Sequence, residues 1–564
     1  MDKVWLKSYP PHVPAQIDPR ELRSLKELVE KACAQHAERV AFIQMGASMT
    51  YRQLDEQSRA FAAWLQHAGF VKGDRIAIML PNTLQYPIAL FGALRAGLTV
   101  VNTNPLYTAP ELQHQLSDSG AKGIVVIENF AHVVEKVLAS TKVVHVLVTA
   151  AGDYLKFPKS HIVNYVVRHV RKQVPAWNIP RASSFKAAVN AGMQLPYRNL
   201  EVGPQDLAFL QYTGGTTGVA KGAMLSHGNV STNTLQAEAW LGKMSQEKGV
   251  LITAIPLYHI FALSCNCLLF ARLGWKNVLI INPRDVPAMM AEFKRYPCVF
   301  LSGVNTLFNA MLNAPDFKSV DFSQLKITLG GGMAVQEAVA KRWKEATGKV
   351  LTQAWGLTET SPAACINPPD TDFNGSIGLP ISSTEIAIKD DAGNDLELGK
   401  AGEICVRGPQ VMVGYWNRPD ETAKVMLPDG FLRTGDVGRM DERGFVYIED
   451  RKKDMILVSG FNVYPNEVEA AIASHPGVLE AAAVAQPDEH SGEVVALFVV
   501  RKDPALTEKD VIDYCRKSLA GYKVPKHVYF KQELPKTNVG KILRKVLREE
   551  LVAHAQAAPK NSER

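Results

Sequence analysis

A run of glycines and threonines carries the clearest chemical signal in the chain. The run extends from Tyr212 to Gly222. Its residues 213–218 are all threonine or glycine, and Lys221 follows three residues later. Glycine lets backbone N–H groups close around phosphate oxygens, while hydroxyls and an ammonium group add donors and charge. The strand-like residues 207–211 precede the run and Ser226 follows it, which predicts a strand, a phosphate-binding loop and a helix. Alone, the run is equally typical of a simple turn, and it lacks the glycine spacing of a Walker A loop.

Five further motifs with chemically useful residues follow in order. Glu359 supplies a carboxylate, which close to a polyphosphate is sensible only with a bridging Mg²⁺. Asp436 can accept hydrogen bonds from both ribose hydroxyls. Singly, these residues have ordinary explanations, namely a surface carboxylate, a turn aspartate and, for Lys541, a solvated lysine. The five motifs are Gly330-Gly331-Gly332, Trp355-Gly356-Leu357-Thr358-Glu359, Thr434-Gly435-Asp436, Arg451, and the segment from Pro535 to Lys541.

Together with the first run, these motifs resemble the signature of the acyl-adenylate-forming superfamily, which includes acyl-CoA synthetases, adenylation domains of peptide synthetases and luciferase. The resemblance covers nearly the whole chain, and chance agreement of the spaced motifs is negligible. It implies ATP, Mg²⁺ and the co-substrate coenzyme A. It also implies that Lys541, Glu359, Thr213 and His259 are catalytic, with Glu359 and Thr213 on the metal ion. The residues implied for nucleotide and coenzyme binding are Thr213, Gly214, Gly215, Thr216, Thr217, Gly218, Lys221, Gly330, Gly331, Gly332, Trp355, Gly356, Thr358, Asp436, Arg451, Lys453, Ser459 and Gly460.

The resemblance implies two half-reactions. A carboxylate oxygen first attacks the α-phosphate of ATP, and Lys541 stabilises the charge on the phosphorus while pyrophosphate leaves. The thiol of coenzyme A then attacks the acyl adenylate, and AMP leaves. Between the steps the C-terminal domain is expected to rotate about Lys453, so that Lys541 leaves and the face carrying Ser459 and Gly460 enters. His259 matches an aromatic residue that gates carboxylate and thiol; by position alone it is a histidine at a strand end.

The subgroup within this superfamily decides the substrate. Amino-acid-activating relatives use an acidic group for the substrate ammonium, and residues 258–261 contain none, so a bound amino acid would leave its buried ammonium unpaired. The segment from Asp429 to Pro465 resembles the fatty-acyl-CoA synthetase signature, and the overall match is to bacterial long-chain fatty acid–CoA ligases. A long-chain fatty acid–CoA ligase is therefore expected. The alternatives are a medium-chain or aryl acid–CoA ligase, a luciferase-like oxygenase and a non-catalytic relative.

Two details bear on substrate and nucleotide binding. The apolar residues Val304, Leu307, Phe308 and Met311 either line an acyl tunnel or belong to the ordinary core. In a tunnel, each buried methylene of the acyl chain would contribute about 0.8 kcal/mol. Trp355 departs from the tyrosine of many relatives at the adenine site.

Alternating helical and strand patterns must position these residues. Apolar runs such as 75–80 predict buried strands. Helices between them, with capping boxes expected at Ser24 and Thr50, predict a largely parallel sheet. Short strands and turns replace this rhythm over about residues 380–450. The expected fold class is α/β.

Two domains are expected. A large N-terminal AMP-binding domain of α/β subdomains covers residues 1–450, with the small β subdomain at about 380–450. A small mobile α+β C-terminal domain covers 451–564. The charged stretch 450–454 is expected to be an exposed hinge, because exposed polar residues tolerate changes in φ and ψ.

Composition limits the partners. The net charge of +7 suits anionic ligands such as the expected fatty acid and is weak support for nucleic acid, which is not expected. Seven scattered cysteines predict reduced thiols in the cytoplasm. No apolar stretch is long enough to cross a bilayer. Basic and aromatic residues at 154–179 predict either peripheral contact with anionic lipid on the cytoplasmic face of the membrane or a solvated helix face. The oligomeric state stays open, with a homodimer considered.

Overall fold

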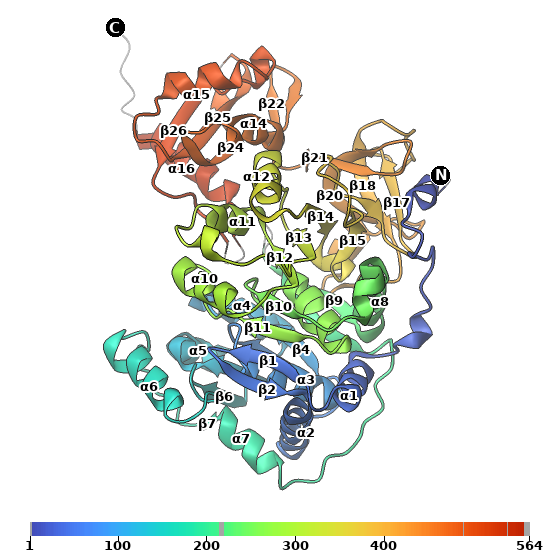
Figure 1. Cartoon of the computed structure of the whole chain (residues 1–564), viewed down its shortest axis with the longest axis vertical. Coiled ribbons are helices and arrows are strands. Elements are labelled where there is room, and N and C mark those ends of the chain that lie inside the picture. The colour runs from blue at the N-terminus through green and yellow to red at the C-terminus, as the bar shows by residue number, and fades with distance from the viewer. Residues whose placement is uncertain (1–2, 214–218, 489, 538–539, 558–564) are drawn as a thin grey trace.

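The computed structural model describes residues 3–213, 219–488, 490–537 and 540–557. Within these ranges the strands form four sheets. Figure 1 shows the two large sheets in the lower and middle body of the molecule, with the smallest sheet beside them and the C-terminal sheet at the far end of the long axis. No helix in the described ranges is both long and apolar enough to cross a bilayer.

The first large sheet is built mainly from short parallel strands that are buried on both faces. Its order is β19-β9-β8-β4-β3-β5-β6-β7. The strands from β8 to β7 are parallel, and β9 and β19 are added antiparallel at one edge. The predicted strand at 75–80 is confirmed as β3. The bounds are β3 Arg75–Met79, β4 Thr99–Asn102, β5 Gly123–Ile127, β6 His145–Thr149, β7 Ala182–Ser184, β8 Leu207–Thr213, β9 Lys221–Ser226 and β19 Gly414–Tyr415.

The second large sheet is also built mainly from parallel strands. Its order is β16-β15-β14-β13-β12-β10-β11-β1-β2, with antiparallel strands only at its two edges among the described residues. The bounds are β1 Val40–Gln44, β2 Ala47–Thr50, β10 Val250–Thr253, β11 Lys276–Leu279, β12 Phe300–Gly303, β13 Ile327–Gly330, β14 Leu351–Gly356, β15 Ala363–Ile366 and β16 Leu379–Pro380.

Two smaller sheets complete the described fold. The first is antiparallel, in the order β17-β18-β20-β21, and the second has the order β23-β22-β25-β24 with β26 parallel to β25. The mixed α/β fold class, with a large N-terminal and a small C-terminal part, is confirmed. The bounds are β17 Glu385–Lys389, β18 Gly402–Arg407, β20 Leu432–Met440, β21 Val446–Arg451, β22 Ile456–Val458, β23 Phe461–Val463, β24 Val478–Asp488, β25 Gly492–Arg501 and β26 His527–Lys531.

Helices connect the parallel strands, because a parallel crossover needs a long connection. Their bounds are α1 Leu25–Gln35, α2 Tyr51–His67, α3 Gln85–Arg95, α4 Ala109–Ser119, α5 Ala131–Val137, α6 Lys159–Tyr165, α7 Phe185–Gly192, α8 His227–Leu241, α9 Phe270–Arg272, α10 Val286–Arg295, α11 Asn305–Leu312, α12 Glu337–Thr347, α13 Pro419–Val425, α14 Pro465–Ala473, α15 Glu508–Cys515 and α16 Arg544–Ala557. Two π-helical segments, Val166–Val170 and Ala262–Leu269, follow α6 and precede α9.

The two predicted capping boxes have different outcomes. At Thr50 the box is complete, because the Thr50 hydroxyl accepts from Gln53 N and the Gln53 side chain accepts from Thr50 N. At Ser24 only half of it forms. The hydroxyl accepts from Glu27 N at 3.2 Å, whereas the Glu27 carboxylate accepts from the backbone of Arg23 instead of Ser24.

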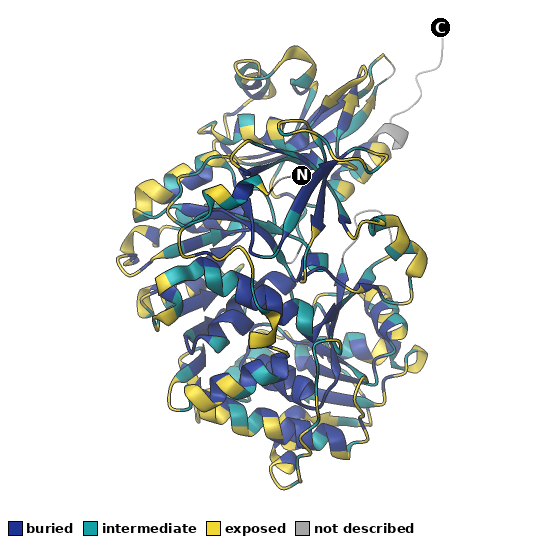
Figure 2. Ribbon diagram, turned by 90° about the vertical axis from the view of Figure 1, so that its right-hand side faces the viewer, coloured by how far each residue is buried: buried dark blue, intermediate teal, exposed yellow. Residues whose placement is uncertain are grey.

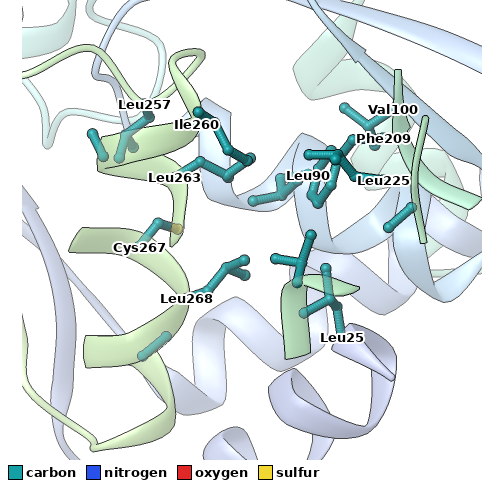
Figure 3. Close-up of a cluster of buried hydrophobic side chains, with 14 of the residues drawn as sticks. Leu25, Leu90, Val100, Phe209, Leu225, Leu257, Ile260, Leu263, Cys267 and Leu268 are labelled. Atoms are coloured by element: carbon teal, nitrogen blue, oxygen red, sulfur yellow. The ribbon is translucent and has the colours of Figure 1, made fainter. Parts of the chain in front are cut away.

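The largest apolar core joins the helices to both large sheets. Figure 3 shows Leu90 of α3, Phe209 of β8 and Leu225 of β9 facing Ile260, just before the π-helical segment Ala262–Leu269, and Leu263 within it. The buried residues of Figure 2 concentrate in the strands and the helices between them. This packing fixes the strand ends at which the predicted site residues lie.

Candidate active site

The predicted motifs meet at the carboxyl ends of β13 and β14. Gly330 ends β13 and Gly356 ends β14. Ligands of open α/β sheets bind outside the carboxyl ends of the strands. The edge of the β20–β21 hairpin and the segment before α16 face the same place, since Asp436 and Lys541 lie there. Residues far apart in the chain therefore share one site.

The glycine triplet forms a turn in which a side chain would be crowded at Gly330 and Gly331. Gly332 has φ +77°, a conformation that favours glycine. A Cβ on Gly331 would lie 3.3 Å from both the Phe261 ring and the Ala354 carbonyl oxygen. The Cε of Lys541 lies 3.8 Å from the position that a Cβ on Gly332 would take. At Gly332 the positive φ, and not a lack of space, favours glycine, and the lysine side chain packs against this turn.

Gly356 and Thr358 shape the chain after β14. A Cβ on Gly356 would lie 1.8 Å from the carbonyl oxygen of Pro362, so only glycine fits there. Thr358 begins the short helix Thr358–Thr360, which carries Glu359. This tight turn directs the predicted Mg²⁺ ligand back toward the strand ends.

Asp436 is held on both sides by other predicted residues. Asp436 of β20 and Arg451 of β21 are cross-strand partners, and their ion pair joins Nε to Oδ1 at 2.9 Å. Trp355 Nε1–H donates to Asp436 Oδ2 at 2.9 Å. The carboxylate is only 1% exposed, and its Oδ1 accepts no hydrogen bond from the described residues. Besides its ion pair with Arg451, this oxygen has remaining acceptor capacity for a ligand hydroxyl.

Tyr415 is a site residue that the sequence analysis missed. Its hydroxyl donates to Glu359 Oε1 at 2.7 Å, and burial and the Glu359 carboxylate raise the pKa of the phenol. The Lys221 ammonium lies 4.8 Å from the centre of the Tyr415 ring and pairs with Glu421 Oε2 at 2.7 Å. No sequence motif marks this arrangement. Gly414 and Tyr415 form the two-residue strand β19, which is recognised by its pairing with β9.

The predicted strand at 207–211 is confirmed as β8 and the helix after Ser226 as α8, but the predicted direct passage from the phosphate loop to that helix is wrong, because β9 lies between them. β8 and β9 are antiparallel, with Thr213 opposite Lys221 and Tyr212 opposite Gly222, so the run joins two strands of a hairpin. The helix α8 begins only after β9, at His227. The prediction failed because β9 is identified by its ladder partners, not by its own short apolar pattern. Thr213 ends β8, and its hydroxyl donates to the Lys221 carbonyl at 3.4 Å. The predicted phosphate residues Gly214, Gly215, Thr216, Thr217 and Gly218 lie outside the described residues.

The segment that carries Lys541 is fixed against α11. The Thr306 hydroxyl donates to the Gly540 carbonyl at 3.1 Å, and Lys541 N donates to the Thr537 hydroxyl at 3.0 Å. Burial is the main cause that lowers the pKa of Lys541 to about 8. The Arg451 charge acts in the same direction, whereas the carboxylates of Asp436 and Glu359 oppose it. Lys541 therefore lies within electrostatic reach of the other predicted groups.

His259 lies beside this lysine as a neutral imidazole. Burial, with a smaller effect of the Lys541 charge, lowers the pKa of His259 to about 3. Its Nδ1 accepts from Phe261 N at 3.3 Å, which leaves the proton on Nε2. Its ring is thus oriented by the backbone that follows it.

Ser459 and Gly460 are not brought to these residues. Lys453, by contrast, lies within electrostatic reach of them, since its charge, like burial, lowers the pKa of Lys541. Ser459 and Gly460 form the exposed turn between β22 and β23, with φ of 49° and 84°. Phe461, the next residue, is 57% exposed and stacks on Tyr522. Lys453 is exposed on the chain before β22. This face of the C-terminal part is turned to solvent in the structure.

The charged stretch 450–454 differs from the exposed hinge that was expected. Asp450 and Asp454 are 0% and 7% exposed. Arg544 lies 3.6 Å from the Asp450 carboxylate and 3.7 Å from that of Asp454, and Arg548 pairs with Asp454 at 2.9 Å. The carboxylates can be buried because the arginines of α16 face them.

Two of the four apolar tunnel candidates belong to the core. Phe308 and Met311 are fully buried, and the Phe308 ring lies 5.0 Å from that of Trp343. Val304, by contrast, lies next to Gly332 and Gly540, near the site. Leu307 is half-buried against the same core.

The chain matches two family descriptions: "AMP-binding enzyme" over residues 29–416 and "AMP-binding enzyme C-terminal domain" over residues 467–541. A long-chain-fatty-acid–CoA ligase of Salmonella typhimurium is 56% identical, over 98% of this chain and 98% of that protein. A protein of the same name from Bacillus subtilis is 37% identical, over 97% of this chain and 98% of the relative. The crystal structure of ATP-bound MatB from Rhodopseudomonas palustris aligns with 28% identity and a TM-score of 0.80, over 93% of this chain and 99% of that one.

These findings agree with the site geometry. The first family match alone covers more than half of the chain. The relatives extend along both the N-terminal and the C-terminal parts. The resemblance to acyl-adenylate-forming proteins is thereby confirmed, and this chain belongs to the AMP-binding enzyme family.

Proposed function

We propose that this chain is a long-chain fatty acid–CoA ligase, an AMP-forming acyl-CoA synthetase that uses ATP. The observation that carries the proposal is the approach of Lys541 to the Gly332 turn, where the carboxylates of Asp436 and Glu359 act on its charge. The names of the full-length relatives support the substrate class. A medium-chain or aryl acid–CoA ligase is the alternative with the same chemistry.

The residues present fit a bound ATP. Asp436 would accept a ribose hydroxyl at Oδ1, while Trp355 and Arg451 keep the carboxylate in place. The Gly331–Gly332 turn and the Trp355 ring would border the adenine. The loop Gly214–Gly218 would hold the phosphates. For Lys221 to join them, its ammonium would exchange Glu421 for phosphate oxygens.

The donors also fit Mg²⁺. This ion is usually held by one or two carboxylates plus substrate phosphates and water. Glu359 supplies one carboxylate and Thr213 one hydroxyl, and no cluster of three or more acidic, histidine or cysteine ligands occurs within the described ranges. When bound, the ion would neutralise charge on the phosphate oxygens. Tyr415 would orient Glu359 through its hydrogen bond to Oε1.

In the first half-reaction, the fatty acid carboxylate attacks the α-phosphate and pyrophosphate leaves. Lys541 contributes a positive charge close to the reacting groups, and its exclusion from water strengthens that effect. The neutral His259 beside it adds no competing charge. Because the protein contributes mainly position and charge, the loss of this one ammonium group is expected to be costly.

In the second half-reaction, the thiol of coenzyme A attacks the acyl adenylate carbonyl and AMP leaves. We propose that residues 451–564 rotate against 1–450 about Lys453, with 380–450 as a β subdomain. Two observations support this rotation. Lys541 faces the strand ends while Ser459 and Gly460 face solvent. Among the described residues, α11 contacts the C-terminal part through isolated hydrogen bonds, such as Asn309 Nδ2 to the Leu479 carbonyl at 3.1 Å.

Three further proposals concern the setting of the reaction. We propose a cytoplasmic enzyme that contacts the cytoplasmic face of a membrane peripherally. We also propose a homodimer, which the mass of the protein in solution tests. Neither assembly nor location affects the chemistry described above.

The substrate class is tested by pyrophosphate release from ATP and Mg²⁺ with acids from acetate to oleate, with and without coenzyme A. Release should rise with chain length, because each buried methylene adds about 0.8 kcal/mol. Acyl-CoA and AMP should be the products. Release with short or aromatic acids only would reject the long-chain proposal and favour the alternative. Absence of release with every acid would reject the ligase.

A further inference from the structure

Lys221, the cation expected to bind phosphate, is paired with a carboxylate in the structure. It lies at the start of β9, opposite Thr213 across the hairpin. Its ammonium group donates to Glu421 Oε2 at 2.7 Å. The Lys221 side chain is 29% exposed and that of Glu421 is 28% exposed, so a ligand from solvent can reach the ion pair.

Local contacts hold Glu421 beside the lysine. It lies in the first turn of α13, where a negative charge interacts favourably with the helix dipole. The helix is fastened to β19, because the Thr422 hydroxyl accepts from Tyr415 N at 2.8 Å. Strand β19 in turn pairs with β9, with Tyr415 opposite Ala223. The edge of the first large sheet therefore sets the position of Glu421 relative to Lys221.

Glu421 has a second cationic partner. Its Oε1 accepts from the ammonium group of Lys424, which lies one turn further along α13, at 2.5 Å. Its contacts with Lys221 and Lys424 lower the pKa of Glu421 to about 2, so the carboxylate is ionised near neutral pH. When Lys221 turns to another anion, Lys424 remains as a counter-ion. Such an exchange therefore leaves no unpaired carboxylate behind.

The lysine also lies close to the expected metal ligand. Its ammonium group is 4.8 Å from the centre of the Tyr415 ring, and the Tyr415 hydroxyl donates to Glu359 Oε1 at 2.7 Å. Tyr415 is largely buried, so its ring forms a fixed spacer between Lys221 and Glu359. A polyphosphate held near Glu359 would bring negative charge close to Lys221 and Glu421. Phosphate and the Glu421 carboxylate would then compete for one cation.

We propose that Glu421 is the resting counter-ion of Lys221 and a positioning residue for pyrophosphate exchange. It holds the ammonium group in the empty site, yields it to the phosphates of ATP, and recaptures it when pyrophosphate leaves. Because the competition lowers the fraction of Lys221 that is free, it weakens the binding of ATP and of pyrophosphate by the same factor. This proposal rests on the proposed function, in which Lys221 binds phosphate.

Binding at equilibrium tests the proposal without turnover. Isothermal titration calorimetry with Mg²⁺ and pyrophosphate, and with Mg²⁺ and α,β-methylene ATP, gives the Kd of each ligand. In Glu421→Gln the lysine has no charged competitor. Both Kd values should therefore fall by about two- to fivefold, as for the loss of an ion pair that solvent reaches. Release of pyrophosphate, followed by stopped flow, should be correspondingly slower.

The matched control is Asp420→Asn. Asp420 is exposed in the same turn of α13, and the carboxylate that pairs with Lys221 belongs to its neighbour. The control removes an equal charge, so a general effect of charge near a polyphosphate would appear in both variants. Both Kd values of the control should stay close to those of the unchanged chain. Equal tightening by Asp420→Asn would overturn the proposal.

A double-mutant cycle shows whether Glu421 acts through Lys221. Lys221→Ala should weaken the binding of both ligands, and Glu421→Gln should have no further effect in that background. An undiminished effect of Glu421→Gln without the lysine would overturn the proposal. Unchanged Kd values in Glu421→Gln, with a lowered Tm, would overturn it in favour of an ion pair that only stabilises the fold.

Activity assays keep this proposal separate from the proposed function. With oleate and coenzyme A saturating, Glu421→Gln should lower KM for ATP and strengthen inhibition by added pyrophosphate. An absence of acyl-CoA formation by the unchanged chain with every acid would reject the ligase and leave the binding results valid. Normal acyl-CoA formation with no effect of Glu421→Gln on either Kd would reject only the counter-ion role of Glu421.

Discussion

At the scale of single residues, the charge on Lys541 is the feature most open to measurement. Burial lowers the pKa of Lys541 to about 8, so the free enzyme loses this proton as the pH rises through that value. The protonated form is the active one in the proposed first half-reaction. We therefore predict that kcat/KM for adenylation falls above a pH of about 8, because kcat/KM reports the free enzyme.

The control for this prediction is Lys541→Arg. A guanidinium stays protonated throughout, so the decline near pH 8 should vanish even where the rate is lower overall. An unchanged alkaline decline in this variant would assign the titration to another group.

Trp355 gives a second prediction at this scale. Its indole donates to the Asp436 carboxylate at 2.9 Å, and a hydrogen bond to a charged group contributes about 1.5–3 kcal/mol. Trp355→Phe should therefore raise KM for ATP by about 10- to 100-fold, with a smaller effect on kcat. Trp355→Tyr keeps a ring with a donor, so its KM for ATP should lie between those of the unchanged chain and of Trp355→Phe. A Phe variant with normal KM would show that the ring alone matters.

The sequence predicted some of these residues and not others. Asp436 and Arg451 stood out because each lies in a local motif, and the β20–β21 register then made them partners. Tyr415 and the pairing of Lys221 with Glu421 gave no such signal. Their roles depend on contacts between segments far apart in the chain, which no local pattern encodes.

At the scale of elements, docking of the lysine segment against α11 depends on Gly540. This residue has φ +83°, and a Cβ on it would lie 2.6 Å from the Thr306 hydroxyl. We predict that Gly540→Ala slows adenylation while leaving thioester formation from supplied acyl-AMP nearly unchanged. Rapid-quench assays of each half-reaction measure this.

A second substitution separates two causes of that effect. Gly540→Ala/Thr306→Ala removes the hydroxyl that the new Cβ would meet, together with its hydrogen bond to the residue 540 carbonyl, and leaves the strain of positive φ, about 1–2 kcal/mol, and a Cβ 3.2 Å from Val304 Cγ2. Adenylation should recover in part. A double variant as slow as the single one would show that backbone strain, and not the contact with α11, is responsible.

The elements themselves were predicted unevenly. Continuous apolar runs predicted buried parallel strands such as β3, and a capping box predicted the start of α2. The hairpin of β8 and β9 was predicted wrongly as a strand, loop and helix. A short strand such as β9 is stabilised by its partners β8 and β19 on either side, so its own six residues carry little information.

At the scale of the whole molecule, the fold class followed from the alternation of strands and helices, and the family followed from the order of the motifs. The burial of Asp450 and Asp454 did not, because the arginines that face them come from α16, far along the chain. The proposed mechanism also depends on the arrangement of the whole molecule. Lys541 and the Ser459–Gly460 turn belong to one C-terminal part and face different surroundings.

In the proposed mechanism, one site performs two half-reactions and Lys541 serves only the first. Rapid-quench measurement of Lys541→Ala tests it directly, with acyl-AMP formation from ATP and oleate in one assay and acyl-CoA formation from supplied oleoyl-AMP in the other. Adenylation should fall by about 100- to 1,000-fold, as for the loss of a preorganised charge at a reacting group. Thioester formation should stay within about twofold, since no stabilisation by Lys541 is lost there. Equal losses in both half-reactions would contradict the account.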